Sequence, residues 1–194
     1  DKVKQNNSAV NGNLGLVYSP GSDWRLSILG SSGFRAPNID DLSKVFDSVK
    51  GDTLGTNSKV GTVILPNPAL KPEYTYNTEI GISKVFNKGI QLSANAYYTA
   101  YRNAISTQNS TFLGQEYIAY GDTLARVQQN LNNAKAYIYG GSVNLKADVT
   151  QNFSIISSVN YTFGRIKTDT TDYPLDHIAP IFGQTSFLLN VKKF

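Results

Sequence analysis

The stretch Tyr74–Phe86, which reads YTYNTEIGISKVF, decides the fold class because its apolar side chains return at every second position. Successive side chains of an extended strand point to opposite faces, so a period of two separates an apolar face from a polar face. The stretch is therefore predicted to form one β-strand. The apolar face carries Tyr74, Tyr76, Thr78, Ile80, Ile82, Lys84 and Phe86, and the polar face carries Thr75, Asn77, Glu79, Gly81, Ser83 and Val85.

The same alternation returns in other segments, and it predicts about seven strands in all. Several segments alternate over about 11–13 residues, whereas strands of soluble domains average about 5–6 residues. A tilted strand that crosses a bilayer needs about 9–11 residues, so the lengths favour a membrane-spanning sheet. The other segments are Leu14–Tyr18, Trp24–Phe34, Ile90–Ala100, Tyr137–Val149, Phe153–Phe163 and Thr185–Val191.

Short and long connections alternate between these segments, which predicts an antiparallel meander. Gly and Asn in the short connections accept the positive φ that tight hairpins need. Short turns at one end of a sheet and long loops at the other are typical of outer-membrane barrels, with the turns in the periplasm. The tight turns are Pro20–Gly21, Asn87–Gly89 and Thr150–Asn152, and the long polar stretches are Ala36–Glu73, Ser106–Gln129 and Lys167–His177.

The apolar face is sorted by height, with aromatic side chains near both ends of the strands and aliphatic side chains between them. Barrel strands carry such aromatic girdles at the two membrane interfaces, so outer-membrane lipid is the expected partner of this face. Lys84 interrupts it near a predicted membrane edge, where its ammonium group can reach water. The girdle near the turns is Tyr18, Trp24, Phe86 and Phe153, and the girdle near the loops is Phe34, Tyr74, Tyr76, Tyr98, Tyr137, Tyr139, Tyr161 and Phe163.

Composition excludes several classes of site. The 194 residues include no Cys and one His, which excludes disulfides, thiolate metal sites, Cys nucleophiles and multi-histidine metal clusters within the chain. The net charge is +4, but no dense Lys/Arg run is present, so no nucleic-acid partner is expected. The sequence has no Ser-His-Asp spacing, paired carboxylates or Gly-rich phosphate loop, and we expect no enzymatic activity and no cofactor.

About seven strands leave unpaired sheet edges, which lipid does not tolerate, and single-chain bacterial barrels have roughly eight strands or more. The chain also begins at Asp1 without Met, and no continuous apolar row precedes Phe194. We therefore expect residues 1–194 to be a stretch of a larger transmembrane barrel domain, with further strands outside it.

Several loop segments, in this order, resemble the β-barrel of TonB-dependent outer-membrane receptors, the ligand-gated transporters of Gram-negative bacteria. The resemblance covers about Asn11 to Phe194. The two most specific segments are FRAPN and NPALKPE, which follow one another across one loop. The segments that carry the resemblance are Gly33–Asn38 with Asp40–Leu42, Asn67–Glu73 with Asn77 and Glu79, Ala96–Tyr98, Tyr101–Ile105, and Asn132–Ala134 before Gly140–Gly141.

The resemblance implies an all-β barrel of about 22 strands in the outer membrane, plugged by a separate N-terminal domain of the same protein. It also implies import of a scarce, bulky ligand, such as an iron-siderophore complex, vitamin B12, haem or a glycan. The energy would come from the TonB complex, which acts through the plug. Neither the plug nor its TonB-contacting peptide lies within this sequence.

The motif residues are expected to serve the scaffold, because a motif shared by receptors of unlike ligands should not recognise the ligand. Arg35 has the parity of the lumen face, where a carboxylate of the plug or of a neighbouring strand could pair with it, and Glu79 points inward towards a plug. The prolines fix φ and remove backbone donors where the chain leaves and re-enters the sheet. The expected scaffold residues are Arg35, Pro37, Asn67, Pro68, Leu70, Lys71, Pro72, Glu73 and Glu79.

Ligand contacts are expected in the outer loops. Phe112, Tyr117 and Tyr120 are aromatic side chains that could stack on a sugar or a catecholate. Asp172, Asp176 and His177 could coordinate a metal, but a single imidazole among loop aspartates is more often a solvated loop, and no metal site is predicted there.

Two other functions remain open at this stage. A passive porin or structural barrel would share the girdles but would have no plug upstream of Asp1. A soluble all-β adhesion or carbohydrate-binding module would be a monodisperse monomer without detergent.

Overall fold

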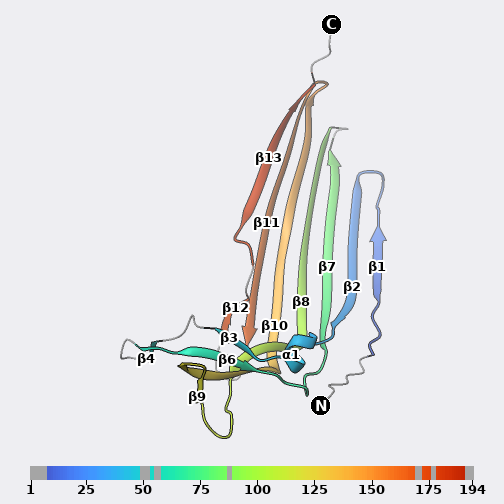
Figure 1. The fold of residues 1–194 in the computed structure, drawn as a ribbon. Coiled ribbons are helices and arrows are strands. Elements are labelled where there is room, and N and C mark those ends of the chain that lie inside the picture. Colours follow the sequence, from blue (N-terminus) through green and yellow to red (C-terminus); the bar gives the residue numbers. More distant parts are fainter. Residues whose placement is uncertain are drawn as a thin grey trace. The chain divides into compact units, whose positions relative to one another are not determined.

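The structure, a computed structural model, describes residues 8–48, 53–54, 58–86, 89–168, 172–175 and 178–190. Strands dominate it, and one short helix interrupts them (Figure 1). No helix of the described residues has the length and apolar character needed to span a membrane. The elements are β1 (Asn13–Tyr18), β2 (Trp24–Arg35), α1 (Ile39–Ser43), β3 (Phe46–Ser48), β4 (Thr53–Leu54), β5 (Ser58–Lys59), β6 (Gly61–Leu65), β7 (Glu73–Phe86), β8 (Ile90–Asn109), β9 (Tyr117–Tyr120), β10 (Thr123–Thr150), β11 (Phe153–Lys167), β12 (Asp172–Pro174) and β13 (Phe182–Leu189).

The seven expected strands are present and neighbour one another in chain order. The main path of the sheet is β1-β2-β7-β8-β10-β11, and β13 pairs with β11. The register of the first pair sets Leu14 opposite Gly30, and that of the last pair sets Ile155 opposite Phe187. The prediction of an all-β sheet with strands long enough for a membrane is confirmed for β2, β7, β8, β10 and β11, whereas β1 and β13 have 6 and 8 residues. Val191, the expected end of the last strand, lies outside the described residues.

The prediction of a long loop over Ser106–Gln129 is wrong in large part. β8 has 20 residues and continues to Asn109, and β10 has 28 residues and begins at Thr123. Polar side chains bridge these extensions: Thr107 Oγ1 donates to Asn130 Oδ1 over 2.6 Å, and Gln128 Nε2 donates to Asn109 Oδ1 over 3.1 Å. Because Thr, Asn and Gln interrupt the apolar residues of both extensions, the alternation of hydropathy that marks the other strands is weak here.

The stretch Ala36–Glu73, expected as one long polar loop, also contains regular structure. It includes α1 and the strands β3 to β6. β6 pairs with β10 in parallel, with Val63 opposite Val127, so the sheet is not a purely antiparallel meander. The apolar run Val60–Leu65 explains the strand, because it buries Val60 and Val63 to 2% and 0% exposure.

The chain divides into two compact units, which we describe separately. The loop unit comprises Asp1–Val10, Phe34–Tyr74 and Arg102–Lys135, and the strand unit comprises Asn11–Gly33, Thr75–Tyr101 and Ala136–Phe194. The loop unit has a small core of Val63, Ala125 and Val127, against which Leu65 and Ile118 pack. It also contains most of the buried apolar side chains of the described residues, including Leu42, Val60, Leu70, Ala104 and Ala134.

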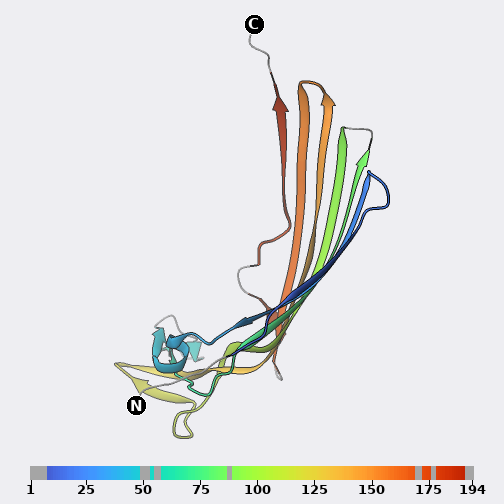
Figure 2. The same ribbon diagram turned by 90° about the vertical axis from the view of Figure 1, so that its right-hand side faces the viewer.

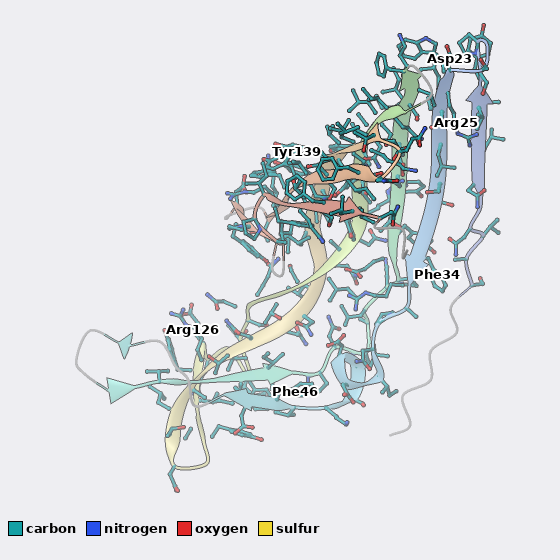
Figure 3. The ribbon with its side chains drawn as sticks, turned by 90° about the horizontal axis from the view of Figure 1, so that it is seen from above. Asp23, Arg25, Phe34, Phe46, Arg126 and Tyr139 are labelled. Atoms are coloured by element: carbon teal, nitrogen blue, oxygen red, sulfur yellow. The ribbon has the colours of Figure 1, made fainter. Side chains whose placement is uncertain are left out.

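The strand unit is a single layer of strands with two different faces. The ends of β1, β7 and β10 and the starts of β2, β8 and β11 lie at one end of it (Figures 1 and 2). Rings of the loop-side girdle contact one another: the centroid of Tyr137 lies 6.2 Å from that of Tyr98 and 6.3 Å from that of Tyr139, and Tyr139 lies 5.2 Å from Phe163. Tyr139 is labelled in Figure 3. The structure thus supports a continuous aromatic surface across β8, β10 and β11.

On the opposite face of the strand unit, one tyrosine spans three strands. Tyr97 of β8 forms a 2.8 Å hydrogen bond through its hydroxyl with Thr162 Oγ1 of β11, and β10 lies between these strands. Gly140 of β10 makes room for this contact, because a Cβ atom there would lie 2.7 Å from Tyr97 Oη and would overlap the carbonyl oxygen of Tyr161. The absence of a side chain at Gly140 therefore permits the hydrogen bond that fixes the three strands together.

We predict that Gly140→Ala destabilises the barrel, because the added methyl group must displace the Tyr97 ring or separate the strands. Overpacking of this kind costs about 1–3 kcal/mol. The measurement is the urea midpoint at which the full-length protein in detergent loses its folded gel mobility. Gly30→Ala is the control, since nothing lies within 4 Å of a Cβ atom at that position. Equal midpoints for the two variants would contradict this role of Gly140.

Candidate functional site

Two of the expected scaffold residues, one from each of the two family-like segments, meet in the loop unit at one buried carboxylate. Glu73, at the start of β7, is 7% exposed. One of its oxygens pairs with Arg35 Nε at the end of β2, and the other accepts a 2.6 Å hydrogen bond from the backbone N–H of Ile105 in β8. Because β7 lies between β2 and β8, this side chain joins both of its neighbours. Arg35 thus pairs with a carboxylate of a neighbouring strand, one of the two partners considered from the sequence.

Asn67 shapes the turn that precedes β7. Its Oδ1 accepts a 3.0 Å hydrogen bond from the N–H of Ala69, and its Nδ2 donates to the carbonyl of Asn130 in β10 over 2.8 Å. The N–H of Asn67 donates to the carbonyl of Asp41 in α1 over 2.9 Å. A short amide side chain that bonds the backbone two residues ahead is the usual way in which Asn sets a turn. Asn67 therefore fixes the turn to both α1 and β10.

Asn132 holds the next part of the same segment. Its Oδ1 accepts a 2.7 Å hydrogen bond from the N–H of Lys71, and its Nδ2 donates to the carbonyl of Lys71 over 2.9 Å and to that of Asn103 over 2.8 Å. The amide group thus pairs with both backbone groups of Lys71, as a neighbouring strand would. Only the backbone of Lys71 enters this arrangement, and its side chain is exposed.

We call this group of residues the motif cluster, and two of its members are buried apolar residues. The members are Arg35, Pro37, Asp41, Asn67, Leu70, Lys71, Glu73, Asn130 and Asn132. Leu70 is 2% exposed, and Pro37 is also buried. Pro72 is half-buried and Pro68 is exposed at the turn. Asn130 donates through Nδ2 to Asp41 Oδ1 over 2.9 Å. Sequence reasoning did not single out Asn130, although its spacing of two from Asn132 along a strand was a usable signal.

Glu79 does not belong to the motif cluster. It lies on β7 in the strand unit, where its Oε1 accepts a 3.3 Å hydrogen bond from Asn95 Nδ2. Asn95 Oδ1 in turn accepts from the N–H and the hydroxyl of Ser142 over 3.0 and 2.6 Å. These residues border a polar depression of about 270 Å³, which also includes Arg25 (Figure 3). The depression therefore presents both charges on the polar face of the sheet.

The expected ligand residues lie on two hairpins of the loop unit. Phe112 is 46% exposed and bridges to Gln115 across a turn whose central residues, Leu113 and Gly114, have positive φ. Tyr120 is 41% exposed and lies beside Gly121, which also has positive φ. In the described part of the chain, no ring contact joins Phe112, Tyr117 and Tyr120 to one another.

Tyr117 differs from the other two because it contacts a charged residue. Arg126 of β10 lies opposite Tyr117 of β9, and its Nε donates to the Tyr117 hydroxyl over 3.0 Å. The guanidinium carbon lies 5.2 Å from the centroid of the tyrosine ring. Arg126 also lines a small pocket of about 170 Å³ with Glu116, Asn109 and Thr111 (Figure 3). This pocket offers a cation, a carboxylate and hydroxyl groups to a polar ligand.

Of the three residues considered for metal binding, the structure describes Asp172 alone. Asp172 Oδ1 accepts a 2.6 Å hydrogen bond from Arg165 Nε, and its Oδ2 lies 3.8 Å from Lys167 Nζ. Asp176 and His177 lie outside the described residues. Among the residues that are described, no three His, Asp or Glu side chains gather to hold a metal ion.

Known proteins resemble this chain in sequence and in fold. A family model described as TonB dependent receptor-like, beta-barrel matches residues 1–189. "Probable hemoglobin and hemoglobin-haptoglobin-binding protein 4" of Haemophilus influenzae is 28% identical over 177 residues, which are 86% of this chain and 16% of that protein. The "Iron-regulated outer membrane virulence protein" of Vibrio cholerae is 26% identical over 168 residues, 80% of this chain and 24% of that protein. The chain thus spans less than about a quarter of these relatives.

A solved structure shows the same fold. The siderophore receptor PirA from Acinetobacter baumannii matches with a TM-score of 0.71 at 18% identity, over 94% of this chain and 26% of PirA. At this identity the likeness concerns the fold alone.

We predict that Glu73→Ala destabilises the protein, because it leaves the N–H of Ile105 without its acceptor and removes one ion-pair partner of Arg35. An unsatisfied buried group costs about 1–3 kcal/mol. The control is Asp40→Ala, which breaks the exposed ion pair of Asp40 with Lys44 and should cost about 0–1 kcal/mol. The urea midpoint of the full-length protein measures both. A loss for Glu73→Ala no larger than that for Asp40→Ala would show that the buried carboxylate is dispensable.

Proposed function

The chain belongs to the TonB-dependent receptor-like β-barrel family, and from this premise we propose that residues 1–194 form part of the barrel wall of an outer-membrane active transporter. Proteins of this family lie in the outer membrane of Gram-negative bacteria, which places the strand unit in that membrane. The single observation that carries the proposal is the family match over residues 1–189. The sorted aromatic girdles and the polar opposite face support it independently.

In the whole protein, the wall is proposed to close as a barrel of about 22 strands around an N-terminal plug domain. The polar depression with Arg25 and Glu79 supports this assembly, because a lumen filled by a protein domain accepts charges that lipid would not. Energy is proposed to reach the ligand from the TonB complex through the plug.

The ligand is proposed to carry iron. Two similar proteins have names that point in this direction: the haemoglobin-binding protein of Haemophilus influenzae and the iron-regulated protein of Vibrio cholerae. Haem and a haem protein are the candidates that the first name suggests, and an iron-siderophore complex is a candidate that the family resemblance implies.

Ligand contact is proposed for Phe112, Tyr117 and Tyr120, with Arg126 beside Tyr117. An exposed ring can stack on a catecholate or a porphyrin, and a guanidinium group can bind a carboxylate or a phenolate. The motif cluster is proposed to act only as scaffold, since its polar atoms are directed at backbone and side-chain partners of the protein itself.

The family match favours this transporter over the two functions left open by the sequence, a passive porin and a soluble carbohydrate-binding or adhesion module. No observation on the described residues favours either of them.

The proposed function predicts energy-dependent uptake. Cells that express the full-length protein as their only receptor of this kind should take up one of three radiolabelled ligands: haemoglobin, free haem or a ferric catecholate siderophore. Uptake should fall to background when a protonophore dissipates the proton gradient, because the TonB complex then supplies no work. Uptake that continues unchanged after this treatment would identify a passive pore instead.

The proposed ligand contacts predict weaker binding for Tyr117→Ala and Phe112→Ala in the full-length receptor. Loss of one stacked ring should raise the Kd by about 2- to 13-fold, since such contacts contribute about 0.5–1.5 kcal/mol. Isothermal titration with the transported ligand measures this change. Phe46→Ala is a matched control, because Phe46 is 41% exposed on β3 of the same unit and has no proposed contact. Kd values equal to that of the control would remove these residues from the ligand site.

A further inference from the structure

A lysine on the lipid-facing side of the strand unit has its charge between two aromatic rings. Lys84 of β7 shares its face with Ile80, Ile82 and Phe86. Its Nζ lies 4.4 Å from the ring centroid of Trp24 and 4.7 Å from that of Phe86. Over the described ranges of the chain, no carboxylate lies within ion-pair distance of this nitrogen. Among the described residues, the ammonium group therefore has ring faces as neighbours and no anionic partner.

The position of Lys84 along its strand indicates which anion its ammonium group can reach. Trp24 is the first residue of β2 and Phe86 the last of β7, so the lysine lies near the end that carries the short turns (Figure 1). Tryptophan and lysine at this level mark the membrane–water interface, where phosphate headgroups lie. A lysine near a membrane surface attracts anionic lipid by about 1 kcal/mol.

An apolar groove lies on the same face as Lys84, between this lysine and the middle of the strands. Its volume is about 440 Å³, and it is lined mainly by Leu26, Ile80, Ile82, Ala94 and Ala96. Leu26 lies two residues after Trp24, and Ile82 lies two residues before Lys84, so the groove begins one side chain from the ammonium group. Two residues of a strand span about 7 Å, which is short enough for one lipid to reach both features.

We propose that Lys84, Trp24, Phe86 and this groove bind one anionic glycerophospholipid of the leaflet next to the short turns. The headgroup phosphate lies on Lys84 Nζ between the two rings, and one acyl chain occupies the groove. Charge complementarity favours a lipid with net negative charge over one whose headgroup also carries an ammonium group, because that second cation would be repelled by Lys84. The two rings order the lysine side chain in advance of binding.

The test is a titration of the full-length receptor in detergent, followed by native mass spectrometry. Phosphatidylglycerol should bind more tightly than phosphatidylcholine with the same acyl chains. Lys84→Gln should weaken phosphatidylglycerol binding about fivefold, which corresponds to the loss of one interfacial lysine, and should abolish the preference. Lys84→Arg should keep both. Lys146→Gln is the charge control, since Lys146 lies on the polar face of β10 and should leave binding unchanged.

A second variant tests the groove without altering the charge. Ala96→Phe fills the groove and should weaken binding of long-chain phosphatidylglycerol, whereas Ala147→Phe, on the lipid-facing side of β10 outside the groove, should not. Equal affinities of the wild type and Lys84→Gln, or of Ala96→Phe and Ala147→Phe, would overturn the proposal. So would a site that prefers lipopolysaccharide to phosphatidylglycerol. Because the two tests are separate, failure of one variant to assemble leaves the other decisive.

Discussion

A single layer of strands has two faces and no interior, and this constraint governs most of the structure. The backbone N–H and C=O groups of each strand in the strand unit must form hydrogen bonds with the neighbouring strands. The side chains of each strand face two different environments, one on each side of the sheet. Among the buried apolar residues of the described chain, Ala136 is the one that belongs to the strand unit, while the others lie in the loop unit. The strand unit is therefore stabilised by hydrogen bonds between its strands and by contact of its apolar face with lipid. The loop unit is stabilised by a packed core of its own.

The sequence predicted the parts of the fold in which hydropathy changes with every residue. β7 and β11 begin within one residue of the expected positions because apolar and polar residues alternate along them. The extensions of β8 and β10 were missed because Thr, Asn and Gln occupy both faces and pair with one another rather than with lipid or water. The parallel pairing of β6 was missed for another reason: it joins segments more than about 60 residues apart, and no local pattern encodes such a partner.

The candidate sites show the same limit. The family-like segments identified Glu73 and Asn67, but only the structure shows that their partners are Arg35, Ile105 and Asn130. The contacts of these side chains are mostly to backbone groups, which any residue at the partner position can provide. For that reason a scaffold motif can persist while the loops around it change. In the described structure, no contact of the exposed rings of Phe112 and Tyr120 indicates their role. Their assignment as ligand contacts therefore depends on binding measurements.

The ion pair between Arg35 and Glu73 has one more consequence. These residues flank segment 36–72, so their contact closes that segment at its base. Once the ends of a loop are fixed, doubling its length costs only about 0.6 kcal/mol of closure entropy. Changes of length in the connections between the elements of this segment thus cost little, whereas Val60, Val63 and Leu70 must stay buried. Such a clasp allows these connections to vary in length while the frame stays unchanged.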